Sequence, residues 1–130
     1  HRIGLFDGIL IKDNHIAAAG SVKTAVEAAL AGAPSDIRVQ VEVQTEEEAL
    51  HACAAGADFL LLDNCSTDAI RDLVKQFGDR ALLEASGGIT LENIRAYAET
   101  GVHRISVGAL THSAVASDVA LEIDQEDRRQ

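Results

Sequence analysis

The sequence predicts an α/β fold made of about five parallel βα units, arranged as part of a TIM-like (β/α) barrel. Strand and helix patterns alternate along the chain, polar residues follow every strand candidate, and small or branched aliphatics supply the apolar mass while aromatics make up only 3%. A complete barrel needs about 250 residues, so 130 residues would form part of one. The alternative is an open doubly wound sheet, which would concentrate its site at one switch point.

The first strand and helix are expected in the opening third of the chain. An apolar run at residues 9–11 predicts a short buried strand that ends in a charged loop. Ser21 is placed to cap a helix whose apolar residues recur at helical spacing, and the Gly-Ala-Pro sequence at residues 32–34 would end it. Residues 37–43 then alternate between valine and polar side chains, which is typical of a strand.

The middle of the chain repeats this order. Thr45 and Glu48 form a capping-box pattern, which predicts a helix running to Gly56. A continuous apolar strand is expected at residues 59–62, followed by a helix over residues 66–77. These two units continue the parallel βα series.

Two more units are expected before a charged end. Residues 81–84 and 103–107 are strand candidates, and Thr90 is placed to cap a helix that runs to residue 97. Apolar residues at 115–123 predict a last helical stretch. The domain organisation expected from these patterns is the barrel portion at residues 1–123 and a charged tail at residues 124–130.

The opening block of the chain carries a concentration of polar groups. His1 and Arg2 precede the first strand, and Lys12 stands at its end, followed by an Asp-Asn-His loop at residues 13–15. Arginine can grip a carboxylate with two parallel hydrogen bonds, so these cations are suited to an anionic ligand. For any single residue, a solvated polar loop at a strand end is an equally good interpretation.

Three acids occupy the ends of three different strand candidates: Glu42, Asp63 and Glu84. In a barrel they would converge on one mouth near Lys12. Carboxylates gathered in this way can hold a divalent cation or sugar hydroxyls. The competing interpretation is a set of internal ion pairs with Lys12, Arg38 or Arg104.

Two glycine-containing loops follow consecutive strand candidates. Ser86-Gly87-Gly88 precedes one helix, and Gly108 opens a segment that contains His112. Glycines let the backbone approach a phosphate closely, and paired strand-end loops of this kind are the usual phosphate grip of barrel enzymes. A lone Gly-Gly is more often a turn, and neither loop matches an ATP-binding or NAD-binding pattern.

Composition excludes several classes of protein. The formal net charge of −10 argues against nucleic acid as a partner. There is no apolar run long enough for a membrane helix, and no histidine spacing typical of zinc sites. Two cysteines without a CxxC spacing favour a reduced, cytoplasmic protein. The chain opens inside a motif and without Met, so we expect a missing N-terminal portion.

Several motifs together resemble one family, the quinolinate phosphoribosyltransferases, or carboxylating nicotinate-nucleotide pyrophosphorylases. They are the opening block from His-Arg to Lys-Asp-Asn-His, Val41-Glu42-Val43, Leu61-Leu62-Asp63-Asn64, Glu84-Ala85-Ser86-Gly87-Gly88-Ile89 and Ser106-Val107-Gly108. They come in the family's order and at close to its spacing. The resemblance implies a pentosyltransferase of NAD biosynthesis that joins quinolinate to phosphoribosyl pyrophosphate. It would yield nicotinate mononucleotide, pyrophosphate and carbon dioxide, with Mg²⁺ as cofactor.

The resemblance also implies roles for individual residues. Lys12, with His1 and Arg2, would contact the quinolinate carboxylates. Glu42 and Asp63 would face the ribose hydroxyls and the metal–pyrophosphate, making Lys12, Glu42 and Asp63 the catalytic group. The 5′-phosphate would be surrounded by Ser86, Gly87, Gly88, Gly108 and His112.

Partners and alternatives follow from the same resemblance. A homodimer or higher homo-oligomer of the full-length chain is expected, and this portion alone could be inactive. Two other functions stay open on the sequence: a non-catalytic phosphate-ligand-binding or assembly domain, and a molybdenum-transport-associated paralogue on the same scaffold.

Overall fold

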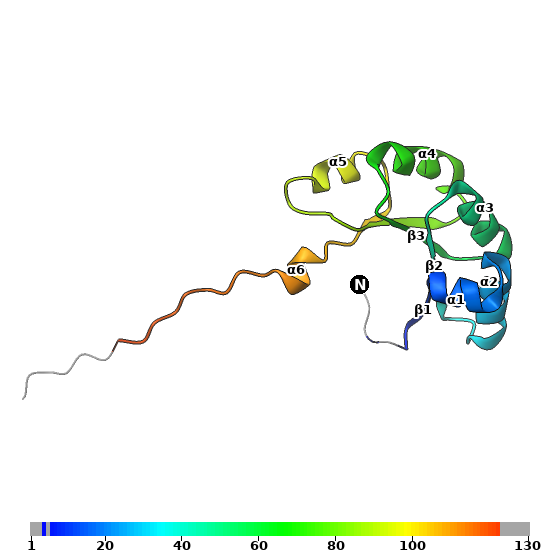
Figure 1. Ribbon diagram of the computed structural model, residues 1–130, viewed down its shortest axis with the longest axis horizontal. Coiled ribbons are helices and arrows are strands. Elements are labelled where there is room, and N and C mark those ends of the chain that lie inside the picture. Colours follow the sequence, from blue (N-terminus) through cyan, green and yellow to red (C-terminus); the bar gives the residue numbers. More distant parts are fainter. Residues whose placement is uncertain (1–3, 5, 123–130) are drawn as a thin grey trace, which may run out of the picture.

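The fold is a single parallel sheet with helices along its outer side (Figure 1). The computed structural model describes residues 4 and 6–122. The strands pair in the order in which they occur in the chain. They are β1 (Gly8–Ile11), β2 (Arg38–Val43), β3 (Phe59–Asp63), β4 (Leu82–Ser86) and β5 (Arg104–Ile105). Because each strand pairs with its successor, this sheet has no switch point. The predicted βα series is confirmed, and the doubly wound alternative is wrong.

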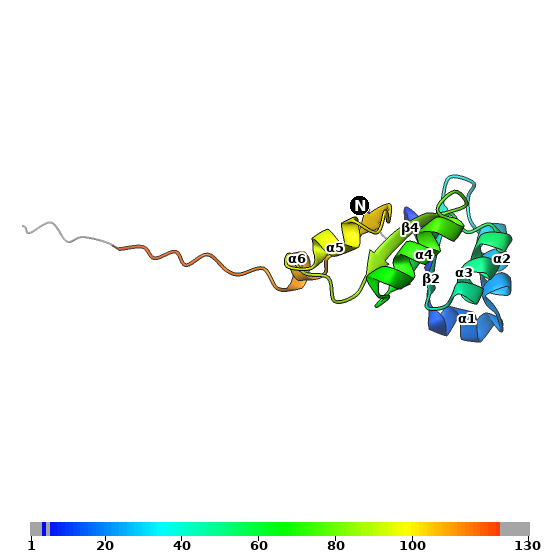
Figure 2. The same cartoon turned by 90° about the horizontal axis from the view of Figure 1, so that it is seen from above.

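In the described part of the chain, six helices connect and follow the strands. Figures 1 and 2 show α2 to α5 lying along the outer side of the curved sheet. The helices are α1 (Asp13–Ala19), α2 (Val22–Gly32), α3 (Glu46–Ala55), α4 (Thr67–Phe77), α5 (Ile94–Ala98) and α6 (Ala109–His112). This arrangement of one helix layer on a sequentially ordered parallel sheet is that of barrel units.

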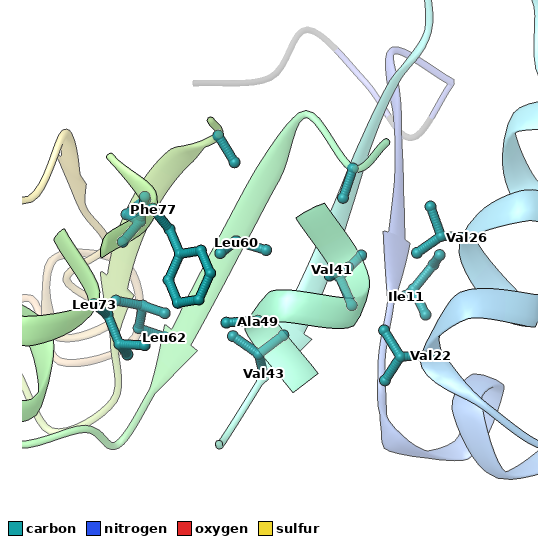
Figure 3. Packing of buried hydrophobic residues seen from close by; sticks show 14 of the residues in the cluster. Ile11, Val22, Val26, Val41, Val43, Ala49, Leu60, Leu62, Leu73 and Phe77 are labelled. Carbon is teal, nitrogen blue, oxygen red and sulfur yellow. The ribbon is translucent and has the colours of Figure 1, made fainter. Parts of the chain in front are cut away.

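The hydrophobic core lies between the sheet and these helices (Figure 3). Val39, Val41 and Val43 alternate along β2 and are at most 1% exposed, because every second side chain of a strand points to the same face. Leu60 of β3 and Phe77 of α4 are also fully buried in this layer. The core is therefore one-sided, and the sheet's second face carries different residues.

We call this second face the inner face. Strand register places the intervening residues on it, since paired residues of parallel strands point the same way. Its members are Gly8 and Leu10 of β1, Arg38, Gln40 and Glu42 of β2, Phe59, Leu61 and Asp63 of β3, Leu82, Glu84 and Ser86 of β4, and Arg104 of β5. Most of the chemistry predicted from the sequence lies on or beside this face, which mixes polar and apolar side chains.

Predicted caps fix the ends of the longer helices. The Ser21 hydroxyl accepts a hydrogen bond from the Thr24 amide at 3.1 Å at the start of α2. Thr45 and Glu48 form the predicted capping box of α3, and Gly56 ends that helix with φ 95°. These local signals depend on a few neighbouring residues, which is why the sequence predicts them well.

One predicted loop and the predicted start of one helix are wrong. Residues 13–15 were expected in a loop and form the start of α1 instead. The helix expected from Thr90 begins only at Ile94 and has five residues. Asn93 accepts a hydrogen bond from the Thr90 amide at 2.8 Å, so the chain makes a turn before the helix starts.

The last helical stretch predicted at residues 115–123 is also wrong where the structure describes it. Residues 113–122 have no regular secondary structure. Val115 and Leu121 are 96% and 87% exposed. A short segment without a packed apolar face is only marginally helical in water. The predicted strand at residues 103–107 is likewise reduced to Arg104–Ile105.

Some predictions fall outside the described residues. Residues 124–130, assigned to a charged tail, lie there, so the boundary at residue 123 stays a prediction. Within the described part of the chain, no helix combines the length and apolar character needed to cross a membrane.

Candidate active site

The candidate site lies at the carboxyl ends of the strands, which meet at one edge of a parallel sheet. Lys12 directly follows β1 and is the N-cap of α1. Its Nζ lies 3.5 Å from Oε2 of Glu42, whose side chain is only 13% exposed. The partial burial of Glu42 strengthens its attraction to the lysine. The structure thus joins two predicted site residues in one ion pair.

Asp63 ends β3 on the same face. Its Oδ2 accepts a hydrogen bond from Nδ2 of the following Asn64 at 2.7 Å. Strand register pairs Asp63 with Ser86, the last residue of β4. The acid and the start of the first glycine loop are therefore direct neighbours across two strands.

Glu84 lies one level deeper in the sheet and is 2% exposed. It accepts hydrogen bonds from Gln40 Nε2 at 3.1 Å and from the Ser106 hydroxyl. These contacts link β4 to β2 and to the end of β5. Glu84 therefore connects three strands across the inner face. These two contacts are with neutral groups that the sequence did not identify, and not the ion pairs of the competing interpretation.

The first glycine loop has a backbone conformation that few residues other than glycine adopt. Gly87 has φ +89° and Gly88 has φ +61°. A Cβ added at Gly88 would meet nothing within 4 Å, so its backbone is open. At Gly108 an added Cβ would come within 3.0 Å of His112 Nε2. His112 thus lies over the second loop, and these predicted phosphate-binding residues form two compact groups.

The helix expected to support the first loop is a weaker feature than predicted. Because α5 starts at Ile94, its N-terminus is separated from Gly88 by a turn. An anion at this loop would therefore depend on the amide groups of the loop itself. His1 and Arg2 lie outside the described residues, so their assignment stays a prediction.

Some contacts of the inner face were not predicted from the sequence, and two arginines have partners other than the site acids. Arg38 pairs with Asp58 at 2.7 Å, and Arg104 stacks over the Phe59 ring with Cζ 4.5 Å from its centroid. Both arginines had been considered as partners of the acids. The alternating pattern of the sequence puts Gln40 on the same face of the strand as Glu42. Nothing in the sequence identified it as the partner of Glu84.

A cavity of about 730 Å³ opens at the other end of the sheet. Arg38, Asp58 and Arg80 are among its lining residues. It lies at the amino ends of β3 and β4, away from Lys12 and Asp63. Asp58, which pairs with Arg38, also accepts a hydrogen bond from the backbone amide of Val39, so these residues have a structural role.

Metal ligands and thiols complete the chemistry of the site. Among residues 4 and 6–122, no group of three or more His, Cys, Asp or Glu side chains is placed to hold a metal ion. The carboxylates of Glu42 and Asp63 are still the donor type that Mg²⁺ prefers, and this ion commonly takes only one or two protein carboxylates plus substrate phosphates. Burial, and then the charge of Asp63, raises the pKa of the Cys65 thiol.

Comparison with known proteins agrees with this geometry. The family described as quinolinate phosphoribosyl transferase, C-terminal domain, matches residues 1–122. A probable nicotinate-nucleotide pyrophosphorylase (carboxylating) of Bacillus subtilis is 47% identical over 123 residues, which cover 95% of this chain and 43% of that protein. A nicotinate-nucleotide pyrophosphorylase (carboxylating) of Mycobacterium leprae is 44% identical over 126 residues, covering 95% of this chain and 44% of the relative.

A solved structure gives the same result in three dimensions. The nicotinate-nucleotide pyrophosphorylase from Francisella tularensis superposes with a TM-score of 0.80 and 47% sequence identity, over 85% of this chain and 39% of that chain. The chain thus spans less than half the length of the relatives it matches. Because the family match extends over nearly all of its residues, the chain belongs to the quinolinate phosphoribosyl transferase family, in the C-terminal domain.

Proposed function

We propose that the protein carrying this chain transfers the phosphoribosyl group of phosphoribosyl pyrophosphate to quinolinate, with loss of carbon dioxide. The products would be nicotinate mononucleotide and pyrophosphate. The observation that carries the proposal is the shared strand-end edge. It brings a lysine–glutamate pair, a second acid and two glycine loops to one side of the sheet.

The chemistry of the acids fits this transfer. The bond between C1 of the ribose and pyrophosphate breaks as the pyridine nitrogen forms its bond to the same carbon. Positive charge develops on the ribose, and Glu42 and Asp63 would stabilise it. The carboxylate lost as carbon dioxide leaves its electron pair on the ring carbon beside a cationic nitrogen, so that charge is largely compensated within the ring. A proton from water then adds to this carbon to give the product.

The remaining groups would bind the two substrates. Gly87, Gly88 and Gly108 would hold the 5′-phosphate through backbone amides, together with Ser86 and His112. Lys12 would pair with a quinolinate carboxylate, aided by His1 and Arg2. Since Lys12 already pairs with Glu42, its ammonium group is held at the mouth before substrate arrives.

Magnesium is the expected cofactor. Glu42 and Asp63 are the residues that would face it, directly or through water. When bound to the diphosphate, Mg²⁺ would neutralise charge on the leaving pyrophosphate. A homodimer or higher homo-oligomer of the full-length protein and a cytoplasmic location belong to the same proposal. The location is supported by the two free cysteines, Cys53 and Cys65.

Two competing functions receive less support. A non-catalytic phosphate-binding domain would have no need of the acids beside the glycine loops. A molybdenum-transport-associated paralogue would use the same scaffold with another substrate. The relatives at 44–47% identity are named as carboxylating nicotinate-nucleotide pyrophosphorylases, which favours the enzyme.

A product assay on the full-length protein tests the proposal. We expect nicotinate mononucleotide and carbon dioxide from quinolinate and phosphoribosyl pyrophosphate, and little product from nicotinate, which lacks the carboxylate that is lost. Leaving a cation unpaired in the nicotinate complex should cost a hundredfold or so in discrimination. Absence of turnover with quinolinate would refute the proposal.

The Lys12→Ala variant separates the two substrates. Calorimetric titration should show weaker quinolinate binding and nearly unchanged binding of phosphoribosyl pyrophosphate. The reverse result would place Lys12 on the pyrophosphate. Arg2→Ala is expected to behave like Lys12→Ala.

A further inference from the structure

We propose that Asn64 is a positioning residue of the site. Its carboxamide holds the Asp63 carboxylate in one orientation and fixes the spacing between that acid and the glycine loop at Gly87. The contacts stand on geometry alone, whereas their consequence for catalysis rests on the proposed function.

The backbone of Asn64 has an unusual conformation. Its φ of +53° is the only positive φ of a non-glycine residue in the described part of the chain. Asparagine tolerates this left-handed region better than most residues, and such outliers concentrate at functional sites. The backbone amide of Asn64 donates a hydrogen bond to the Ser86 carbonyl at 2.9 Å, which holds this turn against β4.

The side chain of Asn64 touches both parts of the site. Nδ2 donates to Asp63 Oδ2 at 2.7 Å, a charge-assisted hydrogen bond that restricts rotation of the carboxylate. On the other side, a Cβ added at Gly87 would lie 2.3 Å from Asn64 Oδ1 and 2.6 Å from its Cγ. Gly87 therefore packs directly against the carboxamide, and only glycine leaves room for it.

The contacts of Asn64 with Asp63 and with Gly87 matter for the proposed reaction. In the proposed reaction the ribose and its 5′-phosphate belong to one molecule, so the acid facing the ribose and the loop holding the phosphate need a fixed separation. An error of about 1 Å in such an arrangement can cost roughly a hundredfold in rate. A residue wedged between Asp63 and Gly87 sets that separation directly.

Two variants of the full-length protein test the inference. Asn64→Gly keeps the left-handed backbone and removes the carboxamide. Asn64→Asp keeps the shape and replaces the amide donor with an acceptor beside Asp63. We expect both to lower kcat/KM for phosphoribosyl pyrophosphate by about 10- to 100-fold, as for other residues that orient a site acid. The KM for quinolinate and the melting temperature should stay near wild type.

Kinetics and structure together decide the matter. Wild-type kcat/KM in either variant would overturn the inference. So would equal losses for both substrates with a lower melting temperature, because that pattern marks a structural residue. A crystal structure of Asn64→Gly should show the Asp63 carboxylate rotated, and an unchanged carboxylate would contradict the inference. If the wild-type protein has no turnover, the proposed function fails, and this crystal structure still decides whether Asn64 orients Asp63.

Discussion

At the scale of single residues, Asp63 is the clearest test of the proposed chemistry. Asp63→Asn keeps the side-chain shape and removes a charge that would face the developing ribose cation. We expect turnover to fall roughly a hundredfold or more, with little change in stability. Asp58→Asn is the matched control at the other end of the sheet. It should lower stability by weakening contacts to Arg38 and the Val39 amide, while turnover is kept.

Equal turnover in the Asp63→Asn variant and the wild type would make Asp63 a structural residue. A loss of turnover in Asp58→Asn as large as that in Asp63→Asn would also count against the assignment, because it would show that removal of an acid at the far end of the sheet disturbs the site equally.

Cys65 reports on the same acid through its reactivity. Its pKa is raised by burial and also by the negative charge of Asp63. Only the thiolate reacts with iodoacetamide, so Asp63→Asn should lower this pKa and speed alkylation at a fixed pH near 8. Cys53 is the internal control, since its pKa is raised by burial and lowered by Arg80. Mass spectrometry of both cysteines gives the rates, and a slower Cys65 reaction would contradict the prediction.

At the scale of elements, the loop after β4 depends on the absence of a side chain at Gly87. Gly87→Ala combines an unfavourable φ of +89° with a clash against Asn64. Gly20→Ala meets the same backbone cost at φ +88° with nothing within 4 Å. Gly20→Ala should lose about 1–2 kcal/mol of unfolding free energy, and Gly87→Ala clearly more.

Phosphate binding supplies the functional half of this comparison. Gly87→Ala should lose inorganic phosphate binding in a calorimetric titration, whereas Gly20→Ala should keep it. Equal losses of unfolding free energy in Gly87→Ala and Gly20→Ala would mean that the loop shifts easily to make room for the added methyl group. Retained phosphate binding in Gly87→Ala would remove this loop from the proposed phosphate site.

The elements also show what the sequence can predict. The helices capped by Ser21 and Thr45 were predicted because their caps need only three or four adjacent residues. The start of α5 was mispredicted, because Asn93 and Thr90 form a turn that competes with the helix. Asn64 was missed for a related reason. Its role depends on a backbone angle and on the approach of Gly87 from the next strand.

At the scale of the whole molecule, the fold class could be predicted because every βα unit repeats the same pattern. The candidate site was predicted in outline, since polar residues after parallel strands must meet at one edge. The pairing of Lys12 with Glu42 fits that rule. The partners of Glu84 could not be predicted, because Gln40 reaches it from β2 and Ser106 from the residue after β5.

The two faces of the sheet lead to a last prediction, which uses neighbouring leucines of β4. Leu83 is 0% exposed in the core, whereas Leu82 is on the inner face and 40% exposed. In the 130-residue chain, Leu83→Ala should cost about 2–5 kcal/mol of unfolding free energy and Leu82→Ala under about 1 kcal/mol. The relatives are more than twice as long as the matched region, so further residues can cover the inner face in a full-length protein.

The Leu82→Ala and Leu83→Ala variants also measure whether the inner face is covered in a full-length protein. In a full-length protein, Leu82→Ala should cost at least about 1 kcal/mol more than in the 130-residue chain, because each buried methylene contributes about 0.8 kcal/mol. The cost of Leu83→Ala should be similar in both, since its core lies between β4 and its own helices. Denaturant unfolding of the four variants gives these differences. An equal Leu82→Ala cost at both lengths would show that the inner face stays open at the amino end of β4, where Leu82 lies.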